Sequence, residues 1–290
     1  MDKHPRTQPH KHPRIGEGIA QPVIIAIALG WLALVLVLPF ASVFIAAFAE
    51  GLPAFMAALT TPEALHAAWL TMLATVVAVA FNLVFGIAAA YAVERTTLPG
   101  RRAIALLLDL PIAVSPVVAG LMFLLLFGRQ GWFGSALDAL GVKIVFALPG
   151  ILLATIFVTL PFVAKEVIGV LRETGPAEEE AAATLGASPA QSFFHIVLPN
   201  IRWAVFYGLV LTAARALGEF GAVSVLSGNI IGQTQTLPLY IEQMYTNYQT
   251  TAAFAAAVPL TLLAVATIAA QKLLGWVSSR DRTRAAMEEN

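Results

Sequence analysis

The sequence contains no cysteine among its 290 residues, and only 12% of them are Asp, Glu, Lys or Arg. Without cysteine the chain forms no disulfide, holds no metal through a thiolate and uses no thiol nucleophile. A soluble domain usually carries about 25% charged residues. Seventeen acids balance seventeen bases, so the net charge gives no general affinity for nucleic acid. Because 59% of the residues are hydrophobic, the composition indicates an integral membrane protein.

The sequence also lacks the groups on which most enzymes depend. It has no G-x-x-x-x-G-K-[ST] run, which is the loop that cradles nucleotide phosphates. His66 and His195 are isolated, and no Ser-His-Asp grouping is evident. We therefore expect no catalytic residue, cofactor or metal in this chain, and we expect any chemistry to come from a partner subunit.

Six apolar stretches are each long enough to cross a bilayer as a helix, which takes about 20 residues. Their polarity does not alternate with a period of two, as it does in the strands of a membrane barrel. The predicted fold class is therefore an all-α membrane protein with six transmembrane helices. The stretches are residues 22–48, 67–93, 103–127, 144–164, 203–226 and 250–271.

These stretches define a transmembrane domain at residues 22–276. The tail before it, residues 1–21, is charged and rich in His and Pro, and it is predicted to be disordered. Residues 277–290 form a C-terminal tail. Bases gather in both tails, after the second stretch and around the loop at about 172–200. The positive-inside rule therefore predicts that both termini and this loop are cytoplasmic.

The loop contains EEAAATLGASPAQSFFHIVLPN, residues 179–200, which predicts two short helices that meet at Gly186. Three glutamates open the first helix, where the helix dipole favours acids. Ser188 and Gln191 have the spacing of a capping box for the second helix. Pro199 is expected to end that helix. We expect one apolar side, including Phe193, Phe194 and Ile196, to pack on the membrane helices. On these residues alone, an amphipathic pair that only links two spans fits equally well.

Seven residues of the loop follow a fixed pattern of Glu-Ala-Ala, three residues, Gly, nine residues, Ile, one residue and Leu-Pro. They are Glu180, Ala181, Ala182, Gly186, Ile196, Leu198 and Pro199. The pattern resembles the EAA motif of permease subunits of bacterial ABC importers. The resemblance implies that these seven residues form an ATPase-coupling site, which docks on cytoplasmic ATPase subunits and transmits their closure to the membrane helices. ATP and Mg would then be bound by those partners.

Further stretches resemble the W-type (CysW-type) permease subunits of sulfate/thiosulfate ABC importers. They include LDLPIAVSPVVAGLMFLLLFG, RALGEFGAVSVLSG and MYTNYQTTAAFAAA. The T-type sister subunit and the molybdate permease are similar to a lesser degree. The resemblance implies a type I ABC importer permease fold in the bacterial inner membrane. It also implies a heterodimer with a T-type sister, two ATPase subunits and a periplasmic or extracellular sulfate-binding protein.

Four polar residues within the apolar stretches are candidates for the translocation pathway: Arg215, Glu219, Ser115 and Asn82. A dianion that crosses a bilayer must be screened by donors, because a bare charge there is very costly. Arg215 and Glu219 also fit a structural ion pair, and Asn82 fits a hydrogen bond between helices. Ser115 stands between two prolines that predict a kink. Asp109 is expected to pair with a base or to cap a backbone break.

Three alternative functions are compatible with parts of the sequence. A molybdate or tungstate ABC permease shares the architecture and differs in the anion. A secondary anion transporter driven by an ion gradient needs no ATPase, so the intact loop motif disfavours it. A membrane scaffold without transport is disfavoured by the charged residues at 215 and 219 within the fifth stretch.

Overall fold

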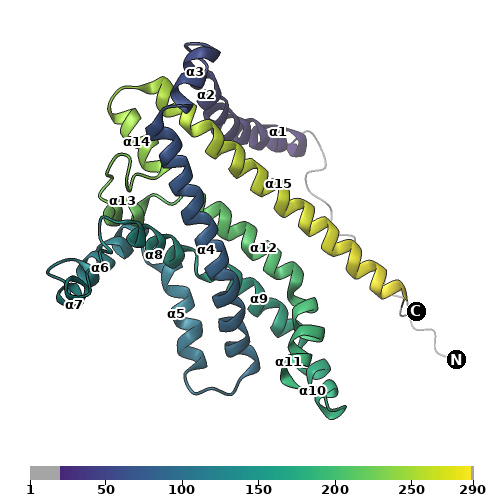
Figure 1. Cartoon of the computed structure of the whole chain (residues 1–290). Coiled ribbons are helices and arrows are strands. Elements are labelled where there is room, and N and C mark those ends of the chain that lie inside the picture. Colours follow the sequence, from purple (N-terminus) through teal and green to yellow (C-terminus); the bar gives the residue numbers. More distant parts are fainter. Residues whose placement is uncertain (1–19, 289–290) are drawn as a thin grey trace. The chain divides into compact units, whose positions relative to one another are not determined.

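The computed structural model describes residues 20–288, and every regular element in that range is a helix (Figure 1). This confirms the predicted all-α class. The predicted disordered tail lies outside the described residues as far as residue 19. In the C-terminal tail, helix continues through Glu288. The chain forms two compact units, one that ends at Ile45 and one that begins at Ala46.

The first unit is an apolar helical segment with one π-helical turn. It comprises α1 (Ala20–Leu32), the π-turn η1 (Ala33–Val37) and most of α2 (Leu38–Ala47). In η1 the N–H of Leu38 reaches back to the carbonyl of Ala33, five residues earlier. The next residue is Pro39, which has no N–H to donate and whose ring crowds the preceding turn. A π-turn directly before a proline loosens that turn and keeps the helix continuous.

The second unit holds the remaining helices, joined by short loops. They are α3 (Leu52–Leu59), α4 (Pro62–Arg95), α5 (Arg101–Ala113), α6 (Pro116–Phe127), α7 (Gly134–Ala139), α8 (Leu148–Thr159), α9 (Pro161–Thr174), α10 (Ala177–Thr184), α11 (Pro189–Ser192), the π-turn η2 (Phe193–Val197), α12 (Leu198–Leu217), α13 (Gly221–Ser227), α14 (Leu237–Thr246) and α15 (Thr250–Glu288).

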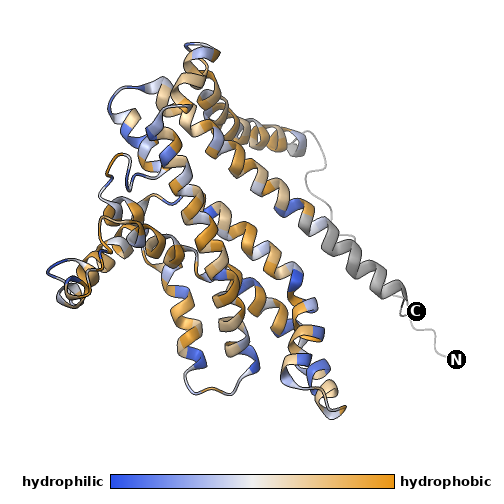
Figure 2. Cartoon of the chain, in the orientation of Figure 1, coloured by the Kyte–Doolittle hydropathy of each residue, from blue (hydrophilic) through white to orange (hydrophobic). Residues whose placement is uncertain are grey.

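Five helical segments in the described range are long and apolar enough to span a membrane, and a bent pair supplies a sixth candidate. Figure 2 shows the apolar residues distributed along these segments. The five are Pro22–Ala47, Pro62–Arg95, Leu148–Thr174, Pro189–Leu217 and Thr250–Leu273. The sixth consists of α5 and α6, which meet at 113°. Each of the six predicted stretches thus overlaps one of these candidates, five of them continuous and one bent, with shifted ends.

The third stretch is broken more sharply than a kink. Helix α5 ends at Ala113, and the two residues that follow are extended, with ψ of 133° at Val114 and 135° at Ser115. Helical geometry is disfavoured for a residue that precedes proline. Pro116 therefore explains why the chain is extended before α6 begins. The kink predicted here is thus a full break, and its angle of 113° makes this segment either a broken span or a re-entrant one.

The fifth stretch is also interrupted, which the sequence did not predict. Helix α12 stops at Leu217, and a separate helix, α13, begins at Gly221. The carboxylate of Glu219 accepts the backbone N–H of Ala222 at 2.8 Å, so it caps the start of α13. A side chain that accepts a hydrogen bond from a free N–H at a helix end lowers the free-energy cost of such a break inside an apolar region.

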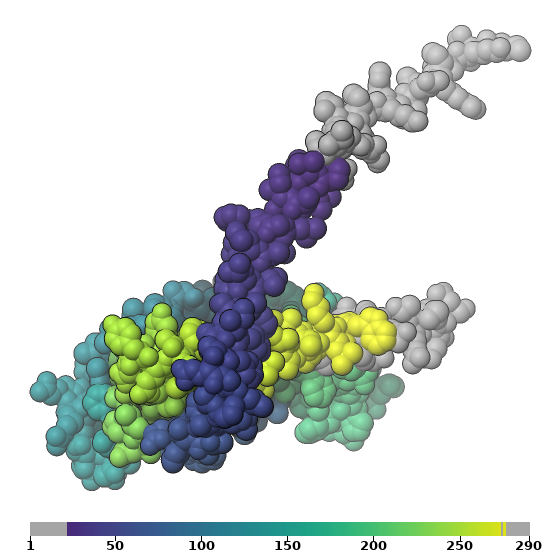
Figure 3. Space-filling model, turned by 90° about the horizontal axis from the view of Figure 1, so that it is seen from above, coloured from purple at the N-terminus to yellow at the C-terminus, as the bar shows by residue number. Residues whose placement is uncertain are grey.

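Two glycine contacts fix how the helices cross. Val163 of α9 is fully buried between α4 and α12. A Cβ atom on Gly86 would lie 2.8 Å from Cβ of Val163, and one on Gly208 would lie 2.7 Å from its Cα. Small residues at such positions let membrane helices approach closely. A Cβ atom on Gly120 of α6 would lie 2.8 Å from the carbonyl oxygen of Ala222 of α13, so these two helices also approach closely. In Figure 3 the yellow-green residues of this part of the chain lie beside teal ones.

We predict that Gly208→Ala lowers the thermal unfolding temperature of the purified protein in detergent. The added methyl would overlap the backbone of Val163, and overpacking of this kind costs about 1–3 kcal/mol. Gly169→Ala is the matched control, because it adds the same methyl to a helical glycine with no atom within 4 Å. Equal unfolding temperatures for the two variants would contradict the close packing of α9 and α12.

Candidate functional site

The first candidate site is the helical hairpin formed by α10, α11 and η2. Its turn lies at Gly186, where φ is +89°, and no atom lies within 4 Å of the position of a Cβ atom there. Backbone conformation alone therefore favours glycine strongly over β-branched residues. At the second helix, Ser188 Oγ accepts the N–H of Gln191 at 3.3 Å, and Gln191 Oε1 accepts the N–H of Ser188 at 2.8 Å. The predicted capping box is confirmed.

The predicted end of the second hairpin helix at Pro199 is wrong. The π-turn η2 precedes this proline, and in it the N–H of Leu198 reaches the carbonyl of Phe193, five residues earlier. As at Pro39, the wider turn gives the proline ring room, and helix continues into α12. The hairpin's second arm and the fifth membrane segment are therefore one helix, Pro189–Leu217, of 29 residues.

Arg95 fastens the hairpin to the end of α4. Its Nε lies 2.6 Å from Glu179 Oε1, and its Nη2 donates to the carbonyl of Gly175 at 2.6 Å. The Arg95 side chain is only 7% exposed, so water screens this ion pair weakly. A further hydrogen bond joins the two arms, from Asn200 Nδ2 to Glu178 Oε2 at 2.8 Å. The hairpin is thus tied to α4 and to α12 together.

The tip of the hairpin is exposed and apolar. Leu185 is 88% exposed, and it lines a shallow cavity of about 490 Å³ together with Ala182, Gly186 and Ile196. Phe193 packs edge-on against Tyr91 of α4, as expected for the apolar side. Phe194 is 61% exposed, so the expectation that it also packs on the membrane helices is wrong. In a π-turn the helical register shifts by one residue, which turns Phe194 outward.

The seven motif residues lie together on this hairpin and at its junction with α12. Four are exposed and three are half-buried. The exposed ones are Glu180, Ala181, Gly186 and Pro199, and the half-buried ones are Ala182, Ile196 and Leu198. No binding partner is present, so their coupling role stays a prediction.

The second candidate site is the junction at which the two broken segments meet. A Cβ atom on Gly221, at the start of α13, would lie 2.9 Å from Cβ of Pro116, at the start of α6. The start of α13 is capped by Glu219. The start of α6 is not, because Ser115 makes no side-chain capping bond there. Free backbone N–H groups at a helix start favour anions, so α6 offers the more suitable helix end.

The ion pair of Arg215 and Glu219 lies beside this junction. Nη1 of Arg215 is 2.6 Å from Oε2 of Glu219. The Glu219 side chain is 1% exposed, whereas that of Arg215 is 32% exposed. The carboxylate is therefore shielded, while part of the guanidinium, which has five N–H donors, stays reachable. The pair is neutral as a whole and still offers hydrogen-bond donors to an anion.

The other two pathway candidates differ in their surroundings. Ser115 is exposed at the junction. Asn82 is fully buried in α4 and donates through Nδ2 to Thr159 Oγ1 of α8 at 2.7 Å. This is the geometry of a hydrogen bond between helices, the alternative role considered for Asn82. Ser115 therefore lies at the start of α6, next to the Pro116 that approaches Gly221 of α13, whereas Asn82 lies in the packed interior.

One charged pair was only half anticipated from the sequence. Asp109 of α5 was expected to pair with a base or to cap a break, and it pairs with Lys165 of α9. Lys165 lies inside α9, which continues to Thr174. The signal available in the sequence was an acid inside an apolar stretch, which needs a counter-charge in the same region.

Comparisons with known proteins agree with this arrangement. A family model described as "Binding-protein-dependent transport system inner membrane component" matches residues 82–275. The chain is 52% identical to the sulfate transport system permease protein CysW of Synechocystis sp. over 252 residues, which cover 87% of this chain and 91% of that protein. It is 38% identical to the sulfate transport system permease protein CysT of Salmonella typhimurium, over 74% of this chain and 77% of that protein.

A solved structure shares the fold. It is a bacterial alginate ABC transporter in complex with an alginate pentasaccharide-bound periplasmic protein, and its matching chain has a TM-score of 0.71 at 18% identity. The match covers 90% of this chain and 94% of that one. The fold is that of an ABC importer permease. The chain belongs to the binding-protein-dependent transport system inner membrane component family, and it is a multi-pass membrane permease subunit.

We predict that Arg215→Ala strongly destabilises the protein and that adding Glu219→Gln recovers most of the loss. Removing the guanidinium leaves a carboxylate that is 1% exposed without its counter-charge, which costs about 3–5 kcal/mol. Glutamine keeps an oxygen to accept the N–H of Ala222 and carries no charge. The measurement is the thermal unfolding temperature of both variants in detergent. A double variant no more stable than Arg215→Ala would contradict a structurally important ion pair.

Proposed function

We propose that this chain is the W-type permease subunit of an ATP-driven importer of sulfate and thiosulfate and forms half of the translocation pathway. Its 52% identity to a CysW sulfate permease, against 38% to a CysT one, supports the W-type assignment and the choice of anion. The junction of the two broken helices, with the partly exposed Arg215, supplies donors for a tetrahedral dianion.

The observation that carries the coupling proposal is the continuity of the hairpin with α12. A helix of 29 residues is roughly 43 Å long. This one begins just after the hairpin turn that carries the exposed Leu185, and it has Arg215 in its last turn. Arg95 fastens the hairpin to α4 as well. A push on the hairpin is therefore passed along a stiff helix to the pathway residues. This mechanical link favours an ATPase-driven permease over an ion-gradient transporter.

The proposed assembly holds two ATPase subunits, one T-type sister permease and a periplasmic or extracellular sulfate-binding protein. The ATPase subunits bind ATP and Mg, whereas this chain binds neither. The positive-inside rule supports cytoplasmic termini and a cytoplasmic hairpin in the inner membrane. ATP binding closes the ATPase pair against the motif residues, which include Glu180, Ala181 and Ala182. This closure turns the translocation pathway outward, and ATP hydrolysis resets the pathway.

We predict that Gly186→Val abolishes association with the ATPase subunits, whereas Gly186→Asn keeps most of it. Nothing lies near the Cβ position, so the substitutions differ only in how well they tolerate a φ of +89°. Asparagine adopts positive φ far more readily than a β-branched residue. Co-purification of tagged ATPase with each variant measures the effect. Equal recovery with valine and with wild type would remove the coupling role of this turn.

The decisive experiment is uptake of labelled sulfate by cells that lack this chain, with and without the restored gene. We expect uptake to be lost on deletion, restored by the gene and reduced by excess thiosulfate. The Arg215→Ala/Glu219→Gln double variant should assemble with its partners normally but should transport sulfate poorly. The contrary outcome is sulfate uptake that stays unchanged on deletion, in cells that have no other sulfate importer. If excess molybdate then competes with the uptake of a different labelled anion, the molybdate or tungstate permease replaces this proposal. Normal transport by the double variant would leave Arg215 a packing role only.

A further inference from the structure

A second cavity lies in the segment between α6 and α8, away from the hairpin and from the helix junction. Its volume is about 920 Å³, and the loop residues 128–147 with the short helix α7 form most of its wall. Arg129 and Lys143 both line it. They are the two bases that the sequence places in loops on the side opposite the hairpin.

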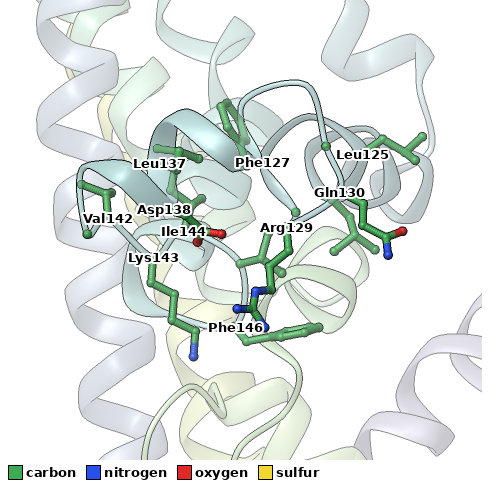
Figure 4. A pocket seen from close by; sticks show the side chains of 16 residues that line it. Leu125, Phe127, Arg129, Gln130, Leu137, Asp138, Val142, Lys143, Ile144 and Phe146 are labelled. Atoms are coloured by element: carbon green, nitrogen blue, oxygen red, sulfur yellow. The ribbon is translucent and has the colours of Figure 1, made fainter.

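The two bases are available for an anion. Figure 4 shows Arg129 and Lys143 entering from different parts of the loop and extending toward the end of the pocket where Phe146 lies. Both side chains belong to exposed residues, and within the described part of the chain neither has an ion-pair partner. Asp138 is the one acid in the lining, so the pocket carries a net positive charge.

Apart from Gln130, the other side chains of the lining are apolar, and they continue into an exposed surface. Leu124, Leu125, Val142 and Ile144 contribute to the wall. Leu125 is also 72% exposed on α6, beside Leu121 and Met122, which are 46% and 48% exposed. The pocket therefore opens onto a helix face that is apolar enough to contact lipid.

This combination points to an amphipathic anion. A lone sulfate ion fills only a small part of about 920 Å³ and gains nothing from apolar walls. We infer that the pocket binds an anionic phospholipid, whose phosphodiester lies between Arg129 and Lys143 and whose acyl chains run along α6. Arg and Lys pair with phosphate oxygens through charge-assisted hydrogen bonds, whichever side of the bilayer supplies the lipid.

The surrounding residues are those of a membrane interface. Trp132 is 85% exposed, Phe133 is 49% exposed and Leu140 is 75% exposed, all in the segment that forms the pocket wall. Tryptophan and other large apolar residues next to bases hold short segments at the headgroup level of a bilayer. A lipid in the pocket would cover part of this surface and fix the loop against α6.

The test uses the full chain, with the subunits that co-purify with it, in detergent. Retention of phosphatidylglycerol and of phosphatidylcholine is measured by native mass spectrometry over a range of lipid concentrations. We expect Arg129→Gln/Lys143→Gln to weaken phosphatidylglycerol binding about twentyfold, because each base near an anionic lipid contributes roughly a factor of five. Phosphatidylcholine binding should not change.

Two controls keep the result interpretable. Arg101→Gln/Arg102→Gln removes the same charge from exposed residues at the start of α5 and should leave the high-affinity lipid in place. Thermal unfolding in phosphatidylcholine alone checks that the pocket variant is folded. Equal phosphatidylglycerol retention by wild type and the pocket variant would overturn the inference. Displacement of the lipid by millimolar sulfate would also overturn it, since the two bases would then serve the free oxyanion.

Discussion

Within a bilayer every backbone N–H and C=O must find a partner inside the protein, and this constraint shapes each irregular point of the chain. The two π-turns lie directly before Leu-Pro pairs and keep helices continuous where a proline removes a donor. The gap between α12 and α13 is tolerated because Glu219 accepts the N–H of Ala222. The gap between α5 and α6 has no side-chain cap at Ser115. The first backbone N–H groups of α6 therefore have no side-chain partner from Ser115.

The hairpin and the helix junction are two ends of one element. The helix Pro189–Leu217 begins at the capped turn and ends beside Arg215. The ion pair between Arg95 and Glu179 prevents the hairpin from moving independently of α4. In the proposed importer, the response to ATP would pass through this connection. The pairing of Arg95 with Glu179 secures the hairpin to α4 and leaves its apolar tip exposed.

Much of this arrangement was predictable from the sequence because it depends on local chemistry. The apolar stretches identified the spans, and Ser188 with Gln191 identified the capping box. Glycine at 186 identified the turn. Where prediction failed, tertiary context decided the outcome. Pro199 does not end its helix, because the π-turn before it absorbs the strain. The break at Glu219 was missed, because an acid four residues after a base reads as a simple helical pair until its second oxygen is seen to cap α13.

The Arg129 and Lys143 pocket could not be anticipated, because its residues come from both sides of α7 and no local pattern links them. The same holds for the pair of Lys165 and Asp109, which joins two separate helices. Sequence patterns report on neighbours along one helix, whereas these sites are made by contacts between elements.

The glycine contacts around Val163 determine which kind of movement the protein can make. Val163 lies so close to Gly86 and Gly208 that a methyl group on either glycine would overlap it. Such close packing opposes sliding of α4 and α12 along α9, the shear type of motion, and favours movement of the three helices together. The chain breaks at Val114–Ser115 and at residues 218–220 interrupt the helices outside this packed region, and bending costs least where helical hydrogen bonds are already absent.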